Sequence, residues 1–179
     1  SLGLHLFPTE RQINLMTVLI TGTSRGIGAE TARIFAAAGA NVALLARSQE
    51  AIAELAGEIG QEAIAIPCNV ARFGEMSSAV ETTVQAFGGL DVLINNAGVL
   101  NAPQSSTLNG LDLRFVVNTL APYLLVKRLL PLFSVTGRII NLASAAQAPV
   151  NFSALIGKRG EMNVMEAYSQ SKLAIIMWS

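Results

Sequence analysis

Thr21-Gly22-Thr23-Ser24-Arg25-Gly26-Ile27-Gly28 is the stretch of sequence that decides the fold. It follows the β-branched and apolar run Val18-Leu19-Ile20 and precedes residues 29–38, so the order is a strand, a glycine turn and a helix. Glycine tolerates positive φ and the close approach of a phosphate, and the start of a helix offers unpaired N–H groups. The stretch therefore predicts a dinucleotide site, although glycine-rich turns also occur in loops that bind nothing.

The spacing of the three glycines limits the classes of nucleotide-binding loop to which this turn can belong. It runs Gly-x-x-x-Gly-x-Gly from Gly22 to Gly28, unlike the Gly-x-Gly-x-x-Gly of many dehydrogenases. No Gly-Lys-Ser/Thr follows the turn, so the pattern disfavours a P-loop nucleotide hydrolase.

Strand and helix patterns alternate along the rest of the chain. We expect strands at 41–46, 63–66, 91–94 and 138–142, and helices at 49–59, 73–87, 111–130 and from about 165. The first helix is expected to turn Ile27, Thr31, Ile34 and Phe35 toward a core, and helix 73–87 to turn Met76, Val80, Val84 and Phe87. Such alternation predicts an α/β fold: a doubly wound, Rossmann-like parallel sheet with helices on both faces and ligands at the carboxyl ends of the strands.

Composition agrees with a buried parallel sheet. The 179 residues are 51% hydrophobic and 13% charged, and 12 basic residues balance 12 acidic ones. With this balance, the chain has no excess of positive charge that would favour binding to nucleic acid or to an anionic membrane. Polar residues interrupt the apolar stretch 115–133, so we expect no membrane span. The lone Cys68 favours a small buried side chain in a reducing cytoplasm. His5 is the only histidine, so we expect neither a catalytic triad nor a metal site.

Tyr168 and Lys172 form the clearest catalytic pattern near the C-terminus. Residues four apart lie on one face of a helix, and a fixed cation beside a phenol favours the phenolate. The pair could therefore serve as a general acid or base. Taken alone, both residues are also ordinary on an exposed helical face.

Several motifs together resemble the short-chain dehydrogenases/reductases. They are the glycine loop, Asn95-Asn96-Ala97-Gly98, Asn118 in a long helix, Ser144 just after a strand, and Tyr168-x-x-x-Lys172. The resemblance covers about residues 17–179, and the length of 145–167 is similar to the retinol-dehydrogenase-like branch, which often acts on lipophilic alcohols, aldehydes or ketones. It implies an oxidoreductase that acts on a small carbonyl or alcohol substrate, and a homodimer is a further expectation.

The resemblance also implies roles for single residues. Tyr168 would donate or accept a proton, Lys172 would bind the nicotinamide ribose and activate Tyr168, Ser144 would polarise the substrate carbonyl, and Asn118 would hold a water of the proton relay. Simpler readings stay open, because Ser144 could be a turn residue and the Asn118 amide could bond to neighbouring backbone. The expected cofactor-binding residues are Gly22, Ser24, Arg25, Gly26, Ile27, Gly28, Arg47, Asn69, Val70, Asn96, Ala97, Gly98, Tyr168 and Lys172.

The residues near the second strand favour NADP over NAD. NAD sites commonly carry an acid about 20 positions beyond the glycine turn, but Arg47 stands there, and Arg25 lies within the loop. Two guanidinium groups suit a 2′-phosphate, although either could be a solvated surface residue. Asn69 replaces the aspartate that usually faces the adenine amine in the family, and its amide oxygen can still accept that hydrogen bond.

Both ends of the chain depart from the family pattern. We expect residues 1–15 to be a leader or extension, and residues 16–179 to be a dinucleotide-binding and catalytic domain whose C-terminal strands and substrate loop are missing. Two alternatives to an active enzyme follow: a dinucleotide-binding module without turnover, or a truncated, inactive fragment of such an enzyme. Loss of carbonyl reduction in a Tyr168→Phe variant that still binds NADPH would argue for an enzyme.

Overall fold

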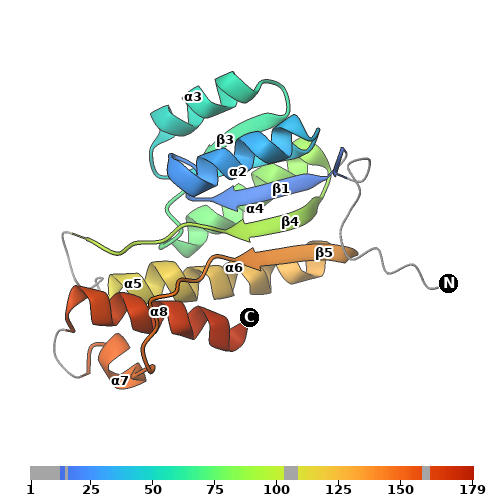
Figure 1. Cartoon of the computed structure of the whole chain (residues 1–179). Coiled ribbons are helices and arrows are strands. Elements are labelled where there is room, and N and C mark those ends of the chain that lie inside the picture. The colour runs from blue at the N-terminus through green and yellow to red at the C-terminus, as the bar shows by residue number, and fades with distance from the viewer. Residues whose placement is uncertain (1–12, 15, 103–108, 159–161) are drawn as a thin grey trace.

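A five-stranded parallel sheet with helices on both faces forms the centre of the computed structural model, which describes residues 13–14, 16–102, 109–158 and 162–179 (Figure 1). The strands lie in the order β3-β2-β1-β4-β5. Their bounds are β1 Thr17–Thr21, β2 Asn41–Ala46, β3 Ala63–Pro67, β4 Leu90–Asn95 and β5 Phe133–Asn141. This order confirms the predicted doubly wound, Rossmann-like arrangement, since the chain reverses its direction of travel between β1 and β4.

Helices cover the two faces in alternation with the strands. They are α2 Gly26–Ala37, α3 Gln49–Ile59, α4 Phe73–Phe87, α5 Leu113–Phe115, α6 Ala121–Leu129, α7 Phe152–Leu155 and α8 Val164–Trp178. One core packs α2 and α3 on the face of β1 that carries Val18 and Ile20. The other packs α4 and α6 on the face that carries Leu19. Because neighbouring side chains of each strand point to opposite faces, all of β1 is buried.

The face that α2 turns to the sheet agrees with the prediction at Phe35, which packs against the core, but differs at the two isoleucines. Ile27 and Ile34 are 69% and 68% exposed, whereas Gly28, Ala29 and Ala32 are buried. Small side chains let a helix approach a sheet closely, so the buried stripe follows glycine and alanine rather than the bulkiest apolar residues. The expectation for helix 73–87 is confirmed, because Met76 and Val80 are buried and Val84 and Phe87 pack against the same core.

The long helix predicted over 111–130 is more irregular than expected. It begins at Leu113, passes through a π-helical turn η1 (Val116–Leu120), continues as α6 and ends in a 3₁₀ turn η2 (Leu130–Leu132). The π-turn contains Asn118, and such turns often occur at functional sites. Among the described residues, Leu113–Leu132 is long and apolar enough to cross a membrane. However, 44% of its most apolar 18 residues are buried in the fold, and the core helix of a soluble protein can have the same length and composition. The absence of a membrane span therefore stays a prediction.

The ends of the described chain add two details. β5 begins earlier than predicted, and its pairing with β4 is irregular between Leu90↔Phe133 and Val92↔Arg138. Ile13 packs against the α2–α3 core, so the last part of the expected leader joins the fold. Residues 1–12 and 15, including His5, lie outside the described residues.

Candidate active site

The glycine loop between β1 and α2 is shaped by close backbone contacts. Gly22 has φ +75°, and a Cβ atom there would lie 2.8 Å from the Cα atom of Ala97. A Cβ atom on Gly28 would overlap the carbonyl oxygen of Gly22 and lie 2.5 Å from Asn96 Nδ2. Only glycine fits these two positions, whereas Gly26 needs glycine for its φ of +60° alone.

Thr21 and Asn96 join this loop to the end of β4. Thr21 Oγ1 accepts hydrogen bonds from the backbone N–H groups of Asn96 and Ala97, at 3.1 and 3.0 Å. Asn96 Nδ2 in turn donates to the carbonyl oxygens of Thr21 and Gly22, at 2.9 and 3.0 Å. The motif Asn95 to Gly98 therefore holds the glycine loop in shape. Thr21 was missed by the sequence reasoning, although its place at the end of the first strand was the available signal.

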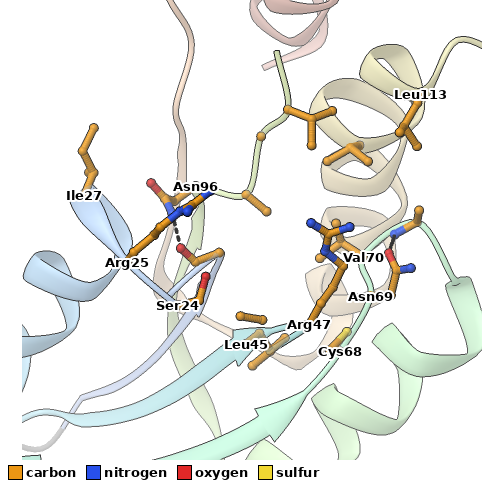
Figure 2. A pocket seen from close by; sticks show the side chains of 17 residues that line it. Ser24, Arg25, Ile27, Leu45, Arg47, Cys68, Asn69, Val70, Asn96 and Leu113 are labelled. Carbon is orange, nitrogen blue, oxygen red and sulfur yellow. Dashed lines mark hydrogen bonds between the residues drawn. The ribbon is translucent and has the colours of Figure 1, made fainter. Parts of the chain in front are cut away.

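A cavity of about 370 Å³ lies at the carboxyl ends of the strands (Figure 2). Of the predicted cofactor-binding residues, those lining it are Gly22, Ser24, Arg25, Ile27, Arg47, Asn69, Val70, Asn96, Ala97 and Gly98. The structure adds Leu45, Ala46, Cys68, Ala71, Val99, Leu113 and Val117. Gly26 and Gly28 shape the glycine loop but do not line the cavity. Tyr168 and Lys172 do not line it either.

The start of α2 beside this cavity fits an anionic group. Arg25 is the N-cap residue, its side chain makes no capping hydrogen bond, and the first turn carries no acidic residue. The first N–H groups of the helix are thus left for a ligand, and their partial positive charge favours phosphate. Figure 2 shows Arg25 on the glycine loop and Arg47 after β2 on two sides of the cavity, and both also line an adjoining hollow with Ser24 and Ser48.

The opposite wall of the cavity follows β3. Asn69 Oδ1 accepts a hydrogen bond from the Ala71 N–H at 3.1 Å, which leaves this oxygen one lone pair for a ligand. Burial, with a smaller effect of the Glu75 carboxylate, raises the pKa of Cys68 to about 11. The Cys68 side chain therefore contributes a neutral thiol rather than a thiolate to this wall.

Asn118 fastens the segment that follows Gly98. Its Oδ1 accepts from the Val99 N–H at 2.8 Å, and its Nδ2 donates to the Val99 carbonyl at 3.0 Å and to Ser171 Oγ at 2.9 Å. The side chain is 1% exposed and both Nδ2 hydrogens are used, while Oδ1 keeps one lone pair. The structure thus shows the simpler reading, an amide bonded to nearby backbone. The relay role stays a prediction.

Helix α8 is held against η1 and the end of β5. Ser171 Oγ donates to the Tyr168 carbonyl at 2.7 Å, and Thr119 Oγ1 donates to the Ser171 carbonyl at 2.8 Å. Lys172 Nζ donates to the Leu142 carbonyl at 2.6 Å. Ser171 was missed because a serine between Tyr168 and Lys172 gives no sign of a partner 53 residues away.

The geometry brings Lys172 next to the cavity wall. A Cβ atom on Gly98 would lie 3.5 Å from both Asn118 Oδ1 and Lys172 Nζ, so both groups lie close to this lining glycine. Lys172 is 5% exposed, and burial lowers its pKa from the ordinary value. Tyr168 is half-buried one turn earlier on the same face of α8.

Ser144 lies just beyond the strand end to which Lys172 is bonded. It is half-buried, and its Oγ accepts from the Ala146 N–H at 3.1 Å. The hydroxyl hydrogen is therefore free to be donated to a ligand oxygen. A hydroxyl donor, a phenol, a buried ammonium and a glycine loop suited to phosphate, all at one end of a sheet, can together support proton transfer to an oxygen beside a bound dinucleotide.

Comparisons with known proteins agree with this arrangement. A family model described as short chain dehydrogenase matches residues 16–179. Human "Retinol dehydrogenase 13" is 33% identical over 96% of this chain and 55% of its own length. The chain thus spans about half the length of such relatives.

Two solved structures show the same likeness in three dimensions. A metagenomic short-chain oxidoreductase in complex with NADP is 31% identical, with a TM-score of 0.71 over 91% of this chain and 72% of its own. The 3-ketoacyl-(acyl-carrier-protein) reductase from Brucella melitensis, complexed with NADH, is 27% identical, with a TM-score of 0.73 over 93% and 68%.

Proposed function

The chain belongs to the short chain dehydrogenase family, and on this premise we propose that it is an NADP-dependent oxidoreductase that transfers a hydride between the nicotinamide and a carbonyl or alcohol substrate. One observation carries the proposal. Gly98 lines the cavity, and Lys172 Nζ and Asn118 Oδ1 each lie 3.5 Å from the position of its absent Cβ atom. The binding and catalytic groups thus meet at one residue.

Hydrogen bonds support the roles of Ser144, Lys172 and Asn118, and the role of Tyr168 rests on its place one turn before Lys172 on α8. The dinucleotide, when bound, supplies or takes up the hydride. Ser144 donates its free hydroxyl hydrogen to the substrate oxygen, where negative charge develops during reduction. Tyr168 gives that oxygen a proton, and the ammonium of Lys172, anchored on the Leu142 carbonyl, stabilises the phenolate that remains. Asn118 holds Val99 and thereby keeps the wall beside Lys172 in place.

NADP is favoured over NAD by two guanidinium groups. Arg25 and Arg47 line both the main cavity and the adjoining hollow, and among the described residues no carboxylate lines either of them. Guanidinium groups bind a phosphate well, whereas a ribose 2′-hydroxyl is usually held by an acid. Solved relatives bind either nucleotide, as the NADP and NADH complexes above illustrate, so the preference rests on this chain's own residues.

A lipophilic substrate is favoured by the segment between Ser144 and Tyr168. Phe152, Ile156, Val164 and Met165 are exposed apolar side chains there, at α7 and at the start of α8. Exposed apolar groups in the segment that connects Ser144 to Tyr168 suit a ligand whose reacting end is polar and whose remainder is not.

Calorimetric titration with NADPH and NADH, followed by assays on lipophilic aldehydes and ketones, tests the proposal. We expect NADPH to bind more tightly, and Arg47→Asp to reverse the order of the two affinities. Tyr168→Phe should retain NADPH binding and lose carbonyl reduction. Binding of neither nucleotide would refute the proposal, and binding with no turnover on any substrate would favour a module that binds without catalysing.

A further inference from the structure

The buried guanidinium of Arg114 has no part in the function proposed so far. Arg114 is 1% exposed and stands on α5, four residues before Asn118. Its Nε donates to the Leu100 carbonyl at 2.9 Å, and its Nη1 lies 3.0 Å from Asp112 Oδ2. Burying such a charge is costly unless it is paired and hydrogen-bonded, so its position needs a reason.

Asp112, the partner of Arg114, connects to the opposite side of the site. Its carboxylate also accepts the Arg114 backbone N–H at 2.8 Å, and its own N–H donates to the Leu155 carbonyl at 3.0 Å. Leu155 is the fully buried end of α7, within the connection between Ser144 and Tyr168. Asp112 therefore joins α7, through its backbone N–H, to Arg114, through its carboxylate.

Leu100, the other partner of Arg114, extends the chain of the wall one residue beyond the lining residue Val99, although Leu100 itself does not line the cavity. Asn118 holds both backbone groups of the preceding residue, Val99, and Arg114 holds the carbonyl of Leu100 itself. Residues four apart lie on the same face of a helix, so one face grips two successive residues of the wall. With the Asn118 contacts alone, the chain beyond Val99 would be free to rotate. The hydrogen bond from Arg114 to the Leu100 carbonyl removes that freedom.

We propose that Arg114, paired with Asp112, is a positioning residue that fixes the Val99–Leu100 wall against α5 and couples it to α7. The Gly98 wall then stays in register with Lys172 and Asn118, while the Asp112 link carries the same constraint to the substrate connection. The effect on catalysis rests on the proposed function above. The effect on the wall itself does not, because it concerns the protein without a ligand.

Three variants and a matched control distinguish the positioning role of Arg114 from a general effect on the stability of the fold. Arg114→Met removes both donors, Arg114→Lys keeps the charge but offers one nitrogen in place of the fork, and Asp112→Asn keeps the shape while weakening the pairing. Arg128→Met is the control, because Arg128 lies on α6, is half-exposed and is 3.9 Å from its carboxylate partner. All four are compared with the wild-type chain by hydrogen exchange and by titration with NADPH.

In the absence of nucleotide, we expect the Val99 and Asp112 amides of Arg114→Met to exchange about tenfold faster, as the loss of one or two hydrogen bonds implies. The β1 amides should exchange as in the wild type. NADPH affinity should fall by a similar factor of about ten, kcat should fall as well, and Arg114→Lys should lie in between. The Arg128→Met control should match the wild type.

Unchanged protection of Val99 and unchanged NADPH affinity in Arg114→Met would overturn the inference and leave the proposed function standing. A wild-type chain that binds neither nucleotide would refute the proposed function, and the exchange rates alone would then decide the inference. If Arg114→Met does not fold, Arg114→Lys and Asp112→Asn give the decision by the same exchange measurement, with wild-type rates in both counting against the inference.

Discussion

At the scale of single residues, the lack of a side chain is what shapes the glycine loop. The absent Cβ atom of Gly28 leaves room for the Gly22 carbonyl and the Asn96 amide, which itself bonds to that carbonyl. The loop is therefore fitted to the end of β4, and an added methyl group would push these two segments apart.

We predict that Gly28→Ala destabilises the fold by about 1–3 kcal/mol, because overpacking forces the backbone to shift, and that it weakens NADPH binding through the displaced loop. Gly57 is the matched control, since it lies within α3 with no atom within 4 Å of an added Cβ. Gly57→Ala should stabilise the protein by about 0.5–1 kcal/mol, the ordinary helix preference for alanine. Urea unfolding measures both, and equal effects of the two substitutions would contradict the prediction.

Lys172 gives a prediction on pH at the same scale. Burial lowers its pKa in the folded chain below the value of 10.5 that it has when exposed. Between those two pKa values the unfolded chain binds more protons than the folded one, so the contribution of Lys172 to the free energy of unfolding rises with pH in that window. Below the lowered pKa both states are charged, and the contribution is constant at its least favourable value.

Lys172→Met removes this contribution, so the difference in unfolding free energy between wild type and variant should shift in favour of the wild type as pH approaches 10.5. Urea unfolding at a series of pH values measures the difference. Lys127, which lies on α6 over the ring of Tyr123, provides the control Lys127→Met. A difference that is flat or falls with pH for Lys172→Met would contradict the burial of this ammonium.

At the scale of elements, α2 shows how close packing selects small residues. Its buried stripe consists of Gly28, Ala29 and Ala32, while Ile34 points outward. We predict that Ala32→Leu costs about 1–3 kcal/mol, because the helix must move off the sheet. Ile34→Gln should change stability by no more than about 0.5 kcal/mol, as is usual at exposed positions. Urea unfolding of both variants is the test, and a larger cost for Ile34→Gln would restore the face expected from the sequence.

The same scale shows what the sequence could and could not predict. Hydrophobic periodicity gave α3, α4 and β2 with their observed bounds, because local patterns are enough to specify such elements. It failed for the face of α2, since apolar character does not reveal how closely a helix approaches a sheet. It also missed the π-turn at Asn118, whose side chain bonds to residues 19 and 53 positions away.

The residues of the candidate site also divide into those with a local sequence signal and those whose partners are distant in the sequence. Motif residues such as Gly22 and Arg47, which line the cavity, had local signals in glycine turns and strand ends. Supporting residues such as Thr21, Ser171 and Arg114 were missed, because their roles lie in partners that only the folded chain brings near. Sequence thus predicts which residues line the cavity better than it predicts what holds them in place.

At the scale of the whole molecule, the cavity depends on the complete sheet order. Its lining comes from the ends of β1, β2, β3 and β4 and from α5 and η1, which span residues 22–117. A ligand that binds only this arrangement must stabilise every element that builds it. Helix α6 is stabilised as well, because it packs against the same core as β1 and β4.

We therefore predict that NADP⁺ shifts the unfolding of a distant reporter. Trp178, the only tryptophan, lies at the end of α8 with its ring 5.5 Å from that of Tyr123, and it does not line the cavity. At a hundredfold excess over its dissociation constant, NADP⁺ should add about 2.7 kcal/mol to the free energy of unfolding. The Trp178 emission maximum and far-ultraviolet circular dichroism should give the same increase, because a cooperative domain unfolds as one unit. NAD⁺ at the same concentration should add less, and Arg47→Asp should remove the advantage of NADP⁺. A Trp178 transition that does not move while the circular dichroism transition does would show that α8 unfolds independently of the cavity.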